Sequence, residues 1–294
     1  MSADSLHTFW SDPGRWRDRL SELPRDPNAI PDALENFVIH HAVARQIGVG
    51  VPDRAEPDRN LRTVARIIET IVERDARPLT EHRDISNYLY GTCHDFALLS
   101  ASTLRENGIA ARLRVGYASY FNRGKWEDHW VCEYRRDDRW ALLDGQLGPI
   151  ARDGLKIGFP VAAMSAKEWR SAASIWQAIR TGIVDEKICG VSFVGIQGRW
   201  FVASAVLRDA AALAGIECLP WDYWGIGRHF LETREVTEDE ARQIDALAEA
   251  LDPAPATRDE ARAVLDQFPW ARPTDAVSSV IVTTPVEVPI QPST

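Results

Sequence analysis

The stretch YGTCHDFALLSASTLRENGIAARLRVGY, residues 90–117, contains the first residues whose types and spacing suggest chemistry. Cys93 follows Thr92 and precedes an apolar pattern with helical spacing, and Asp95 completes the Thr-x-x-Asp pattern of a capping box. Cys93 is therefore predicted in the first turn of a helix, where unpaired backbone N–H groups and the helix dipole favour the thiolate. The pattern makes Cys93 a candidate nucleophile. Core packing is the alternative, because free cysteine is often buried without a role.

A thiolate nucleophile needs a base, and the base needs a group that orients it. Two alternating strands around a polar turn follow, with His129 starting the first and Asp144 ending the second. A turn at 136–137 places the two residues directly opposite each other, whereas a turn at 137–138 makes them a diagonal pair on one face. A one-residue slip would separate them to opposite faces. The sequence thus permits a triad with Cys93, while each residue taken singly also fits a purely structural role.

Periodicity predicts the elements that must position these residues. Apolar residues at three- and four-residue steps indicate helices, and alternation indicates strands. The predicted helices cover about 12–23, 31–47, 61–71, 166–180, 199–214, 238–251 and 257–268. The predicted strands cover about 109–121, 129–135, 139–144 and 190–196.

Composition limits the classes of function. The chain has 294 residues, 45% of them hydrophobic, which is enough for a full core. A formal net charge of −9 argues against a nucleic-acid partner, and no apolar run or leader pattern indicates a membrane partner. The four cysteines form no CxxC pair, so free thiols in the cytoplasm are expected. The spacing of Cys189, Cys218 and His229 predicts no metal site, and no cofactor is expected.

The segments GTCHDFALLSASTLRENGIAARLRVGYASYF, DHWVCEY and RWALLDGQL resemble, in order and spacing, the core of the transglutaminase-like superfamily. The resemblance covers about 89–147, roughly a fifth of the chain. It implies Cys93 as nucleophile, His129 as general base and acid, and Asp144 as the residue that orients the imidazole. It also implies an α+β fold related to papain-like cysteine proteases, with the Cys helix packed on an antiparallel sheet and extra N- and C-terminal helices.

A single transglutaminase-like domain over residues 1–275 is expected, because no repeat or Gly/Ser linker marks a boundary. It would comprise N-terminal helices (1–78), a catalytic core (79–150) and a C-terminal elaboration (151–275). Residues 276–294 are predicted to form an extended or disordered tail.

Four further residues are candidates for substrate contacts: Tyr90, His94, Trp126 and Asp128. His94 neighbours Cys93 but diverges from it by about 100° on a helix, so lining the site fits it better than acting as base. Asp128 departs from the family pattern and is a rival carboxylate for His129.

Other polar residues have a simpler interpretation. Arg112 and Arg114 alternate along a predicted strand, which is typical of a solvated strand face.

These observations predict a thiol-dependent enzyme that forms a Cys acyl-enzyme from an amide or ester carbonyl of a peptide, a protein or a small acyl substrate. Hydrolysis, as in a peptidase or amidase, is ranked first. Transglutaminase-type ligation and thioester cyclisation are the alternatives within catalysis. A non-catalytic module that binds a peptide or protein in the same groove is the alternative outside it. The backbone N–H of Cys93 is expected to form part of the oxyanion hole, and the sequence assigns no second donor.

Overall fold

The structure is a computed structural model that describes residues 2–46, 48–280 and 286–290. The chain divides into two compact units. Unit 1 consists of Met1–Leu113 and Val131–Met164, and unit 2 consists of Arg114–Trp130 and Ser165–Thr294. The single domain expected over residues 1–275 stays a prediction.

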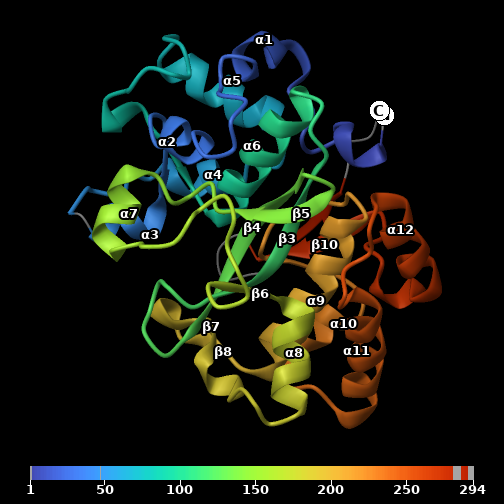
Figure 1. Ribbon diagram of the computed structural model, residues 1–294. Helices are drawn as coiled ribbons and strands as arrows, with labels where there is room; N and C mark the ends of the chain where they lie inside the picture. The colour runs from blue at the N-terminus through green and yellow to red at the C-terminus, as the bar shows by residue number, and fades with distance from the viewer. Residues whose placement is uncertain (1, 47, 281–285, 291–294) are drawn as a thin grey trace. The chain divides into compact units, whose positions relative to one another are not determined.

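Unit 1 combines helices with short strands (Figure 1). Its helices are α1 (Arg17–Leu20), α2 (Ile30–Leu34), α3 (His41–Gln46), α4 (Ala55–Arg59), α5 (Val64–Arg74), α6 (Cys93–Glu106) and α7 (Pro149–Leu155). Its strands are β1 (Val38–His40), β2 (Leu89–Gly91), β5 (Arg139–Leu143) and parts of β3 (Ala111–Ala118) and β4 (Trp126–Arg136).

Helix α6 forms the centre of unit 1. It packs against α1, α2, α5 and β2, and every residue from Cys93 to Arg105 is buried (Figure 1). The predicted start at Cys93 is confirmed. The helix ends before Gly108, whose φ of +73° belongs to the left-handed region that glycine adopts readily.

The predicted helix over 31–47 is wrong in its middle, and residue 47 lies outside the described residues. Helix α2 ends at Leu34, and Val38–His40 forms β1 before α3 begins. Strand β1 pairs in parallel with β2, with His40 opposite Gly91. Parallel pairing between segments about fifty residues apart leaves no local signal, so helical spacing dominated the prediction.

The predicted β-hairpin is confirmed, with β4 antiparallel to β5 and Arg136 opposite Arg139. Asp137 and Asp138 form the two-residue turn, and both have positive φ, +48° and +60°, as a type I′ turn requires. The solvated face predicted for Arg112 is wrong. Its side chain is buried, lies 2.7 Å from Glu133 and stacks 3.9 Å from the ring of Trp140.

Unit 2 contains the remaining elements (Figure 1). Its helices are α8 (Ala172–Arg180), α9 (Arg199–Leu213), α10 (Ile226–Thr233), α11 (Glu238–Leu251) and α12 (Arg258–Gln267). Its strands are β6 (Trp169–Ser171), β7 (Cys189–Val191), β8 (Ile196–Gln197), β9 (Asp222–Tyr223), β10 (Ala276–Ser279) and β11 (Val286–Pro289).

Helix α9 forms the core of unit 2, with α8, α10, α11 and α12 packed around it. The carboxylate of Asp209 on this helix accepts hydrogen bonds from Nε and Nη2 of Arg114, both at 3.0 Å, and from the backbone N–H of Val115 at 2.8 Å. The solvated face predicted for Arg114 is therefore also wrong. In this unit β6 pairs antiparallel with β3, and β7 pairs in parallel with β4.

The segment predicted as a tail contains strands β10 and β11, which pair antiparallel with Val277 opposite Val288. Residues 281–285 and 291–294 lie outside the described residues.

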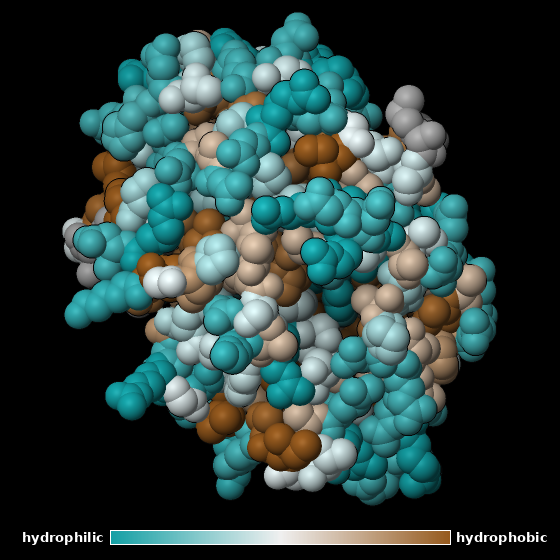
Figure 2. All heavy atoms as spheres, viewed as in Figure 1, coloured by the Kyte–Doolittle hydropathy of each residue, from teal (hydrophilic) through white to brown (hydrophobic). Residues whose placement is uncertain are grey.

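Charged and polar side chains dominate the face shown in Figure 2, where hydrophobic residues form separate small groups. None of the helices in the described part of the chain has the length and apolarity needed to cross a membrane.

Candidate active site

Cys93 is the first residue of α6, and Thr92 is its N-cap. The predicted capping box is present: Asp95 Oδ2 accepts the backbone N–H of Thr92 at 2.7 Å and its hydroxyl at 3.1 Å. Cys93 is buried, with 8% of its surface exposed. Its sulfur therefore lies at a helix N-terminus whose first turn is fixed by side-chain hydrogen bonds.

The strand before Cys93 is held by a buried ion pair. Asp58 accepts Nη1 of Arg74 at 2.8 Å and the backbone N–H of Tyr90 at 3.0 Å. Gly91 leaves little room for a side chain, because a Cβ there would lie 3.0 Å from Asp95 Oδ2 and 3.2 Å from Val38 Cγ1. The backbone entering α6 is thus fixed on both sides of Thr92.

Asp144 follows β5 directly and is buried in the same unit as Cys93. Its backbone N–H donates to Val161 at 2.9 Å, and its Oδ1 accepts the backbone N–H of Gln146 at 2.9 Å. The next residue is Gly145, where a Cβ would lie 2.3 Å from Ser100 Oγ and 3.0 Å from the Phe96 carbonyl oxygen. The backbone beside Asp144 therefore lies directly against α6.

His129 lies on β4 in unit 2 and is buried. Its ring contacts Phe121 edge-on at 4.7 Å and Tyr120 at 6.0 Å between centroids. Its carbonyl accepts the indole N–H of Trp169 at 3.0 Å. Aromatic side chains and a buried hydrogen bond therefore fix this part of β4.

The structure thus places Cys93 and Asp144 in unit 1 and His129 in unit 2. All three residues are buried: Cys93 begins α6, His129 lies within β4, and Asp144 follows the last residue of β5. Their grouping into one triad stays a prediction.

The candidates for substrate contacts lie in different surroundings. Tyr90 belongs to a small core with Ile39 and Tyr88, and its hydroxyl donates to the Gly50 carbonyl at 3.4 Å. His94 is fully buried on α6. These positions show packed side chains, and their contact with substrate stays a prediction.

The other two candidates lie on β4 in unit 2. Trp126 is half-buried, and the guanidinium carbon of Arg170 lies 5.8 Å from its ring centre. Burial raises the pKa of Asp128 to about 6, although Arg208 and His129 oppose this shift. Adjacent strand residues point to opposite faces, so Asp128 is a poor partner for the ring of His129.

Sequence reasoning missed His41, which lies near the start of α6. This residue lies one residue beyond β1, and its Nδ1 lies 3.4 Å from the carbonyl oxygen of Gly91. Burial, and then Arg59, lower the pKa of His41 to about 4. The ring is therefore neutral at pH 7, and Nδ1 carries the proton because a carbonyl only accepts. The parallel β1–β2 pairing brings these residues together, and no local pattern reports it.

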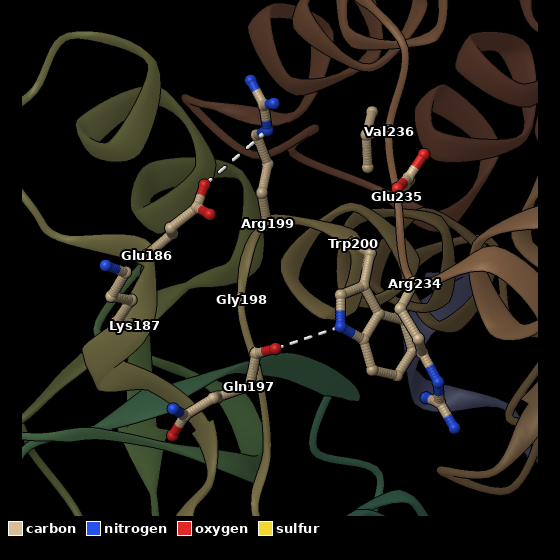
Figure 3. Close-up of a pocket in the computed structure, with 9 residues that line it drawn as sticks. All are labelled: Glu186, Lys187, Gln197, Gly198, Arg199, Trp200, Arg234, Glu235 and Val236. Carbon is tan, nitrogen blue, oxygen red and sulfur yellow. Dashed lines mark hydrogen bonds and ion pairs between the residues drawn. The ribbon is translucent and has the colours of Figure 1, made fainter.

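A polar cleft of about 570 Å³ lies in unit 2 at the start of α9 (Figure 3). Glu186 and Arg199 form an ion pair at 3.6 Å on one wall, and Arg234 stacks 4.0 Å from the Trp200 ring on the other. None of the predicted triad residues lines it. In the described part of the chain, no three His, Cys, Asp or Glu side chains gather as a metal site would require.

Residues 41–145 match the family model of the transglutaminase-like superfamily. The matched segment includes Cys93, His129 and Asp144. Proteins of this superfamily generally use cysteine-based acyl-transfer chemistry, and some are non-catalytic. Searches of curated proteins and of solved structures found no match to the chain.

Proposed function

We propose that the protein is a thiol-dependent acyl-transfer enzyme in which Cys93, His129 and Asp144 form the triad. His129 takes the proton of Cys93, and the sulfur attacks an amide or ester carbonyl of a peptide, a protein or a small acyl substrate. The protonated imidazole then gives its proton to the leaving group, and a Cys93 acyl-enzyme remains. Asp144 orients the imidazole and stabilises its charged form.

One observation carries this proposal: Cys93 is the first residue of a buried, side-chain-capped helix of 14 residues. A buried cysteine used only for packing gains nothing from that position, whereas a nucleophile gains the helix dipole and nearby unpaired N–H groups. The backbone N–H of Cys93 is one oxyanion donor in this proposal.

The hairpin register supports the pairing of base and orienting group. Leu143 lies opposite Cys132, so the same register carried one residue further places Asp144 opposite Val131. Side chains alternate along a strand, so His129 points to the same side of β4 as Val131. The pair is then diagonal on one face, which is the second of the two arrangements that the sequence allows.

The proposed fold is the papain-like arrangement, with the Cys helix packed on the sheet that carries the base. Hydrolysis is the proposed outcome, because water is the acceptor that needs no binding site of its own. Ligation to an amine and cyclisation of a thioester use the same acyl-enzyme and differ in the acceptor.

A p-nitrophenyl ester tests the proposal. The enzyme should release a burst of about one equivalent of p-nitrophenol and then turn over, with the acyl group found on Cys93 by peptide mass mapping. Cys93→Ala should abolish the burst. Partition of the acyl group between water and an added amine, such as glycine amide, separates hydrolysis from ligation. If wild-type protein gives no acylated Cys93 while other thiols react equally, the non-catalytic binding module is the better account.

A further inference from the structure

Unit 1 contains an arginine, Arg59, whose guanidinium forms no ion pair among the described residues. Arg59 ends α4 and is half-buried, and its Nε donates to the carbonyl of Ala55 at 3.2 Å. Within the described residues no carboxylate lies at ion-pair distance from Arg59, and no acceptor bonds its terminal Nη atoms. A guanidinium stays charged at pH 7 even when partly buried, so this charge is available to a ligand.

Gly91 and Asp95, which flank Cys93 in the sequence, relate Arg59 to the start of α6. The ionised carboxylate of Asp95, in the first turn of α6, attracts Arg59 electrostatically. Nδ1 of His41 lies 3.4 Å from the carbonyl oxygen of Gly91. Burial is the largest cause of the lowered pKa of His41, and the charge of Arg59 is the next largest. Helix α4 also packs on β2, where Asp58 bonds the backbone N–H of Tyr90. Arg59 is thus held beside the strand that leads into Cys93.

A second cation reinforces this charge. Arg45 in the last turn of α3 is exposed and has no ion-pair partner among the described residues. Burial lowers the pKa of Arg59, and the carboxylate of Glu56 opposes this shift. The charge of Arg45 lowers the pKa of Arg59 further, because the guanidinium groups of Arg45 and Arg59 repel each other. Neither guanidinium forms an ion pair among the described residues, so an anionic ligand group that bonds both would stabilise them.

We propose that Arg59, assisted by Arg45, forms an anion subsite next to Cys93 that selects acyl substrates carrying a carboxylate close to the reactive carbonyl. This inference rests on the proposed function, because it assigns the substrate class of the same nucleophile. The planar guanidinium offers two parallel N–H donors to the two carboxylate oxygens.

Two alkylating agents that differ in charge test the subsite. Iodoacetate carries a carboxylate next to its reactive carbon, and iodoacetamide is its neutral counterpart. In both reactions the Cys93 thiolate forms an S–C bond as the C–I bond breaks, and iodide leaves with the electron pair. The ratio of the two rate constants at Cys93, obtained by peptide mass mapping, reports the local charge and is independent of how reactive the thiol is.

We expect Arg59→Gln to lower the iodoacetate-to-iodoacetamide ratio about three- to tenfold, and Arg45→Gln to lower it less. Arg59→Lys should lower the iodoacetate-to-iodoacetamide ratio less than Arg59→Gln does, because lysine keeps the positive charge. Arg139→Gln, which removes an exposed arginine from the same unit, should leave it unchanged. Added NaCl should lower the wild-type ratio toward that of a free thiol without any substitution, so the test does not depend on variant folding.

An unchanged ratio in folded Arg59→Gln, or a wild-type ratio insensitive to salt, would overturn the anion subsite. Rapid iodoacetamide labelling of Cys93 with an unchanged ratio would leave the proposed function standing and reject only the subsite. Slow labelling of Cys93 by both agents would count against the proposed function, and the ratio measured at pH 9, where most thiols ionise, would still decide on the subsite.

Discussion

Helices α6 and α9 are both long and buried along almost their whole length, yet they begin differently. Helix α6 starts with Thr92 and Asp95 hydrogen-bonded to each other, and its first residue is Cys93. Helix α9 starts after Gly198, which has a φ of +107° and provides no side-chain cap. Side chains therefore define the start of α6, whereas backbone freedom at one glycine defines the start of α9.

The buried polar groups of the two helices also differ in use. The carboxylate of Asp209 on α9 accepts hydrogen bonds from Arg114 and from the backbone N–H of Val115, so it stabilises unit 2. Asp95 on α6 caps the helix, but its Oδ1 is buried with no hydrogen-bond partner among the described residues. Both helices therefore contain buried polar atoms without hydrogen-bond partners, but α9 has them near its C-terminal end, at the guanidinium of Arg208, whereas α6 has one at the end that carries the cysteine.

The largest expected effect separates the cysteines of the two units. Cys93→Ala should reduce acyl transfer by at least about a thousandfold, because it removes the nucleophile. Cys189→Ala in unit 2 should retain activity within about twofold, because burial raises the pKa of Cys189 to about 12 and keeps it a thiol. Steady-state rates with a p-nitrophenyl ester measure both. Comparable losses in the two variants would contradict the assignment.

The second effect concerns pH and Asp95. Burial raises the pKa of Asp95 to about 7, so the folded state holds a proton that the unfolded state loses above about pH 4. Between about pH 4 and 7 the carboxyl of Asp95 is ionised in the unfolded state and protonated in the folded state. The free energy of unfolding should therefore fall as pH rises through this range. The free energy of unfolding of Asp95→Asn, relative to that of wild type, should rise across this pH range by on the order of 3 kcal/mol.

Urea unfolding at several pH values measures that difference. His41, whose lowered pKa contributes with the opposite sign, is present in both proteins and cancels. A constant difference between the two proteins would show that Asp95 does not titrate in this range.

The third effect tests the contact between the Asp144 loop and α6. Gly145→Ala should destabilise the protein by about 1–3 kcal/mol, because the new Cβ would overlap Ser100 Oγ and approach the Phe96 carbonyl. Gly154→Ala is the matched control, since its Cβ would meet nothing within 4 Å. Thermal unfolding compares the two. Equal stability of both variants would mean that the loop moves away from α6 easily.

The smallest effect concerns the cap. Thr92→Ala should cost about 1 kcal/mol of stability, because it removes a hydroxyl from the start of α6, while Thr92→Ser should be nearly neutral. Chemical denaturation provides both values. If Thr92→Ala were as stable as Thr92→Ser, the capping box would not define the start of this helix.

Much of the local structure was predictable because it depends on neighbouring residues. The capped start at Cys93, the hairpin around Asp137 and Asp138, and the helix over Glu238–Leu251 follow from caps, turns and periodicity. These features need no information from distant parts of the chain.

Long-range pairing was not predictable. Strand β1 lies inside a segment with helical spacing and exists because β2 pairs with it. The same is true of Arg114, whose partner Asp209 is far away in the sequence. For the candidate site, residue types and spacing indicated Cys93, His129 and Asp144, but Arg59 depends on the packing of α4 on β2 and could not be found in this way.

Alkylation of the four cysteines by iodoacetamide, followed across pH by peptide mass mapping, tests whether Cys93 is a nucleophile activated by His129. We expect Cys93 to react first at about pH 6–7, because an imidazolium stabilises its thiolate. His129→Ala should slow Cys93 by about tenfold or more, and Asp144→Ala should slow it less, because Asp144 orients the ring without contacting the sulfur. Equally slow labelling of all four cysteines, or a Cys93 rate unaffected by His129→Ala in folded protein, would rule out the proposed triad.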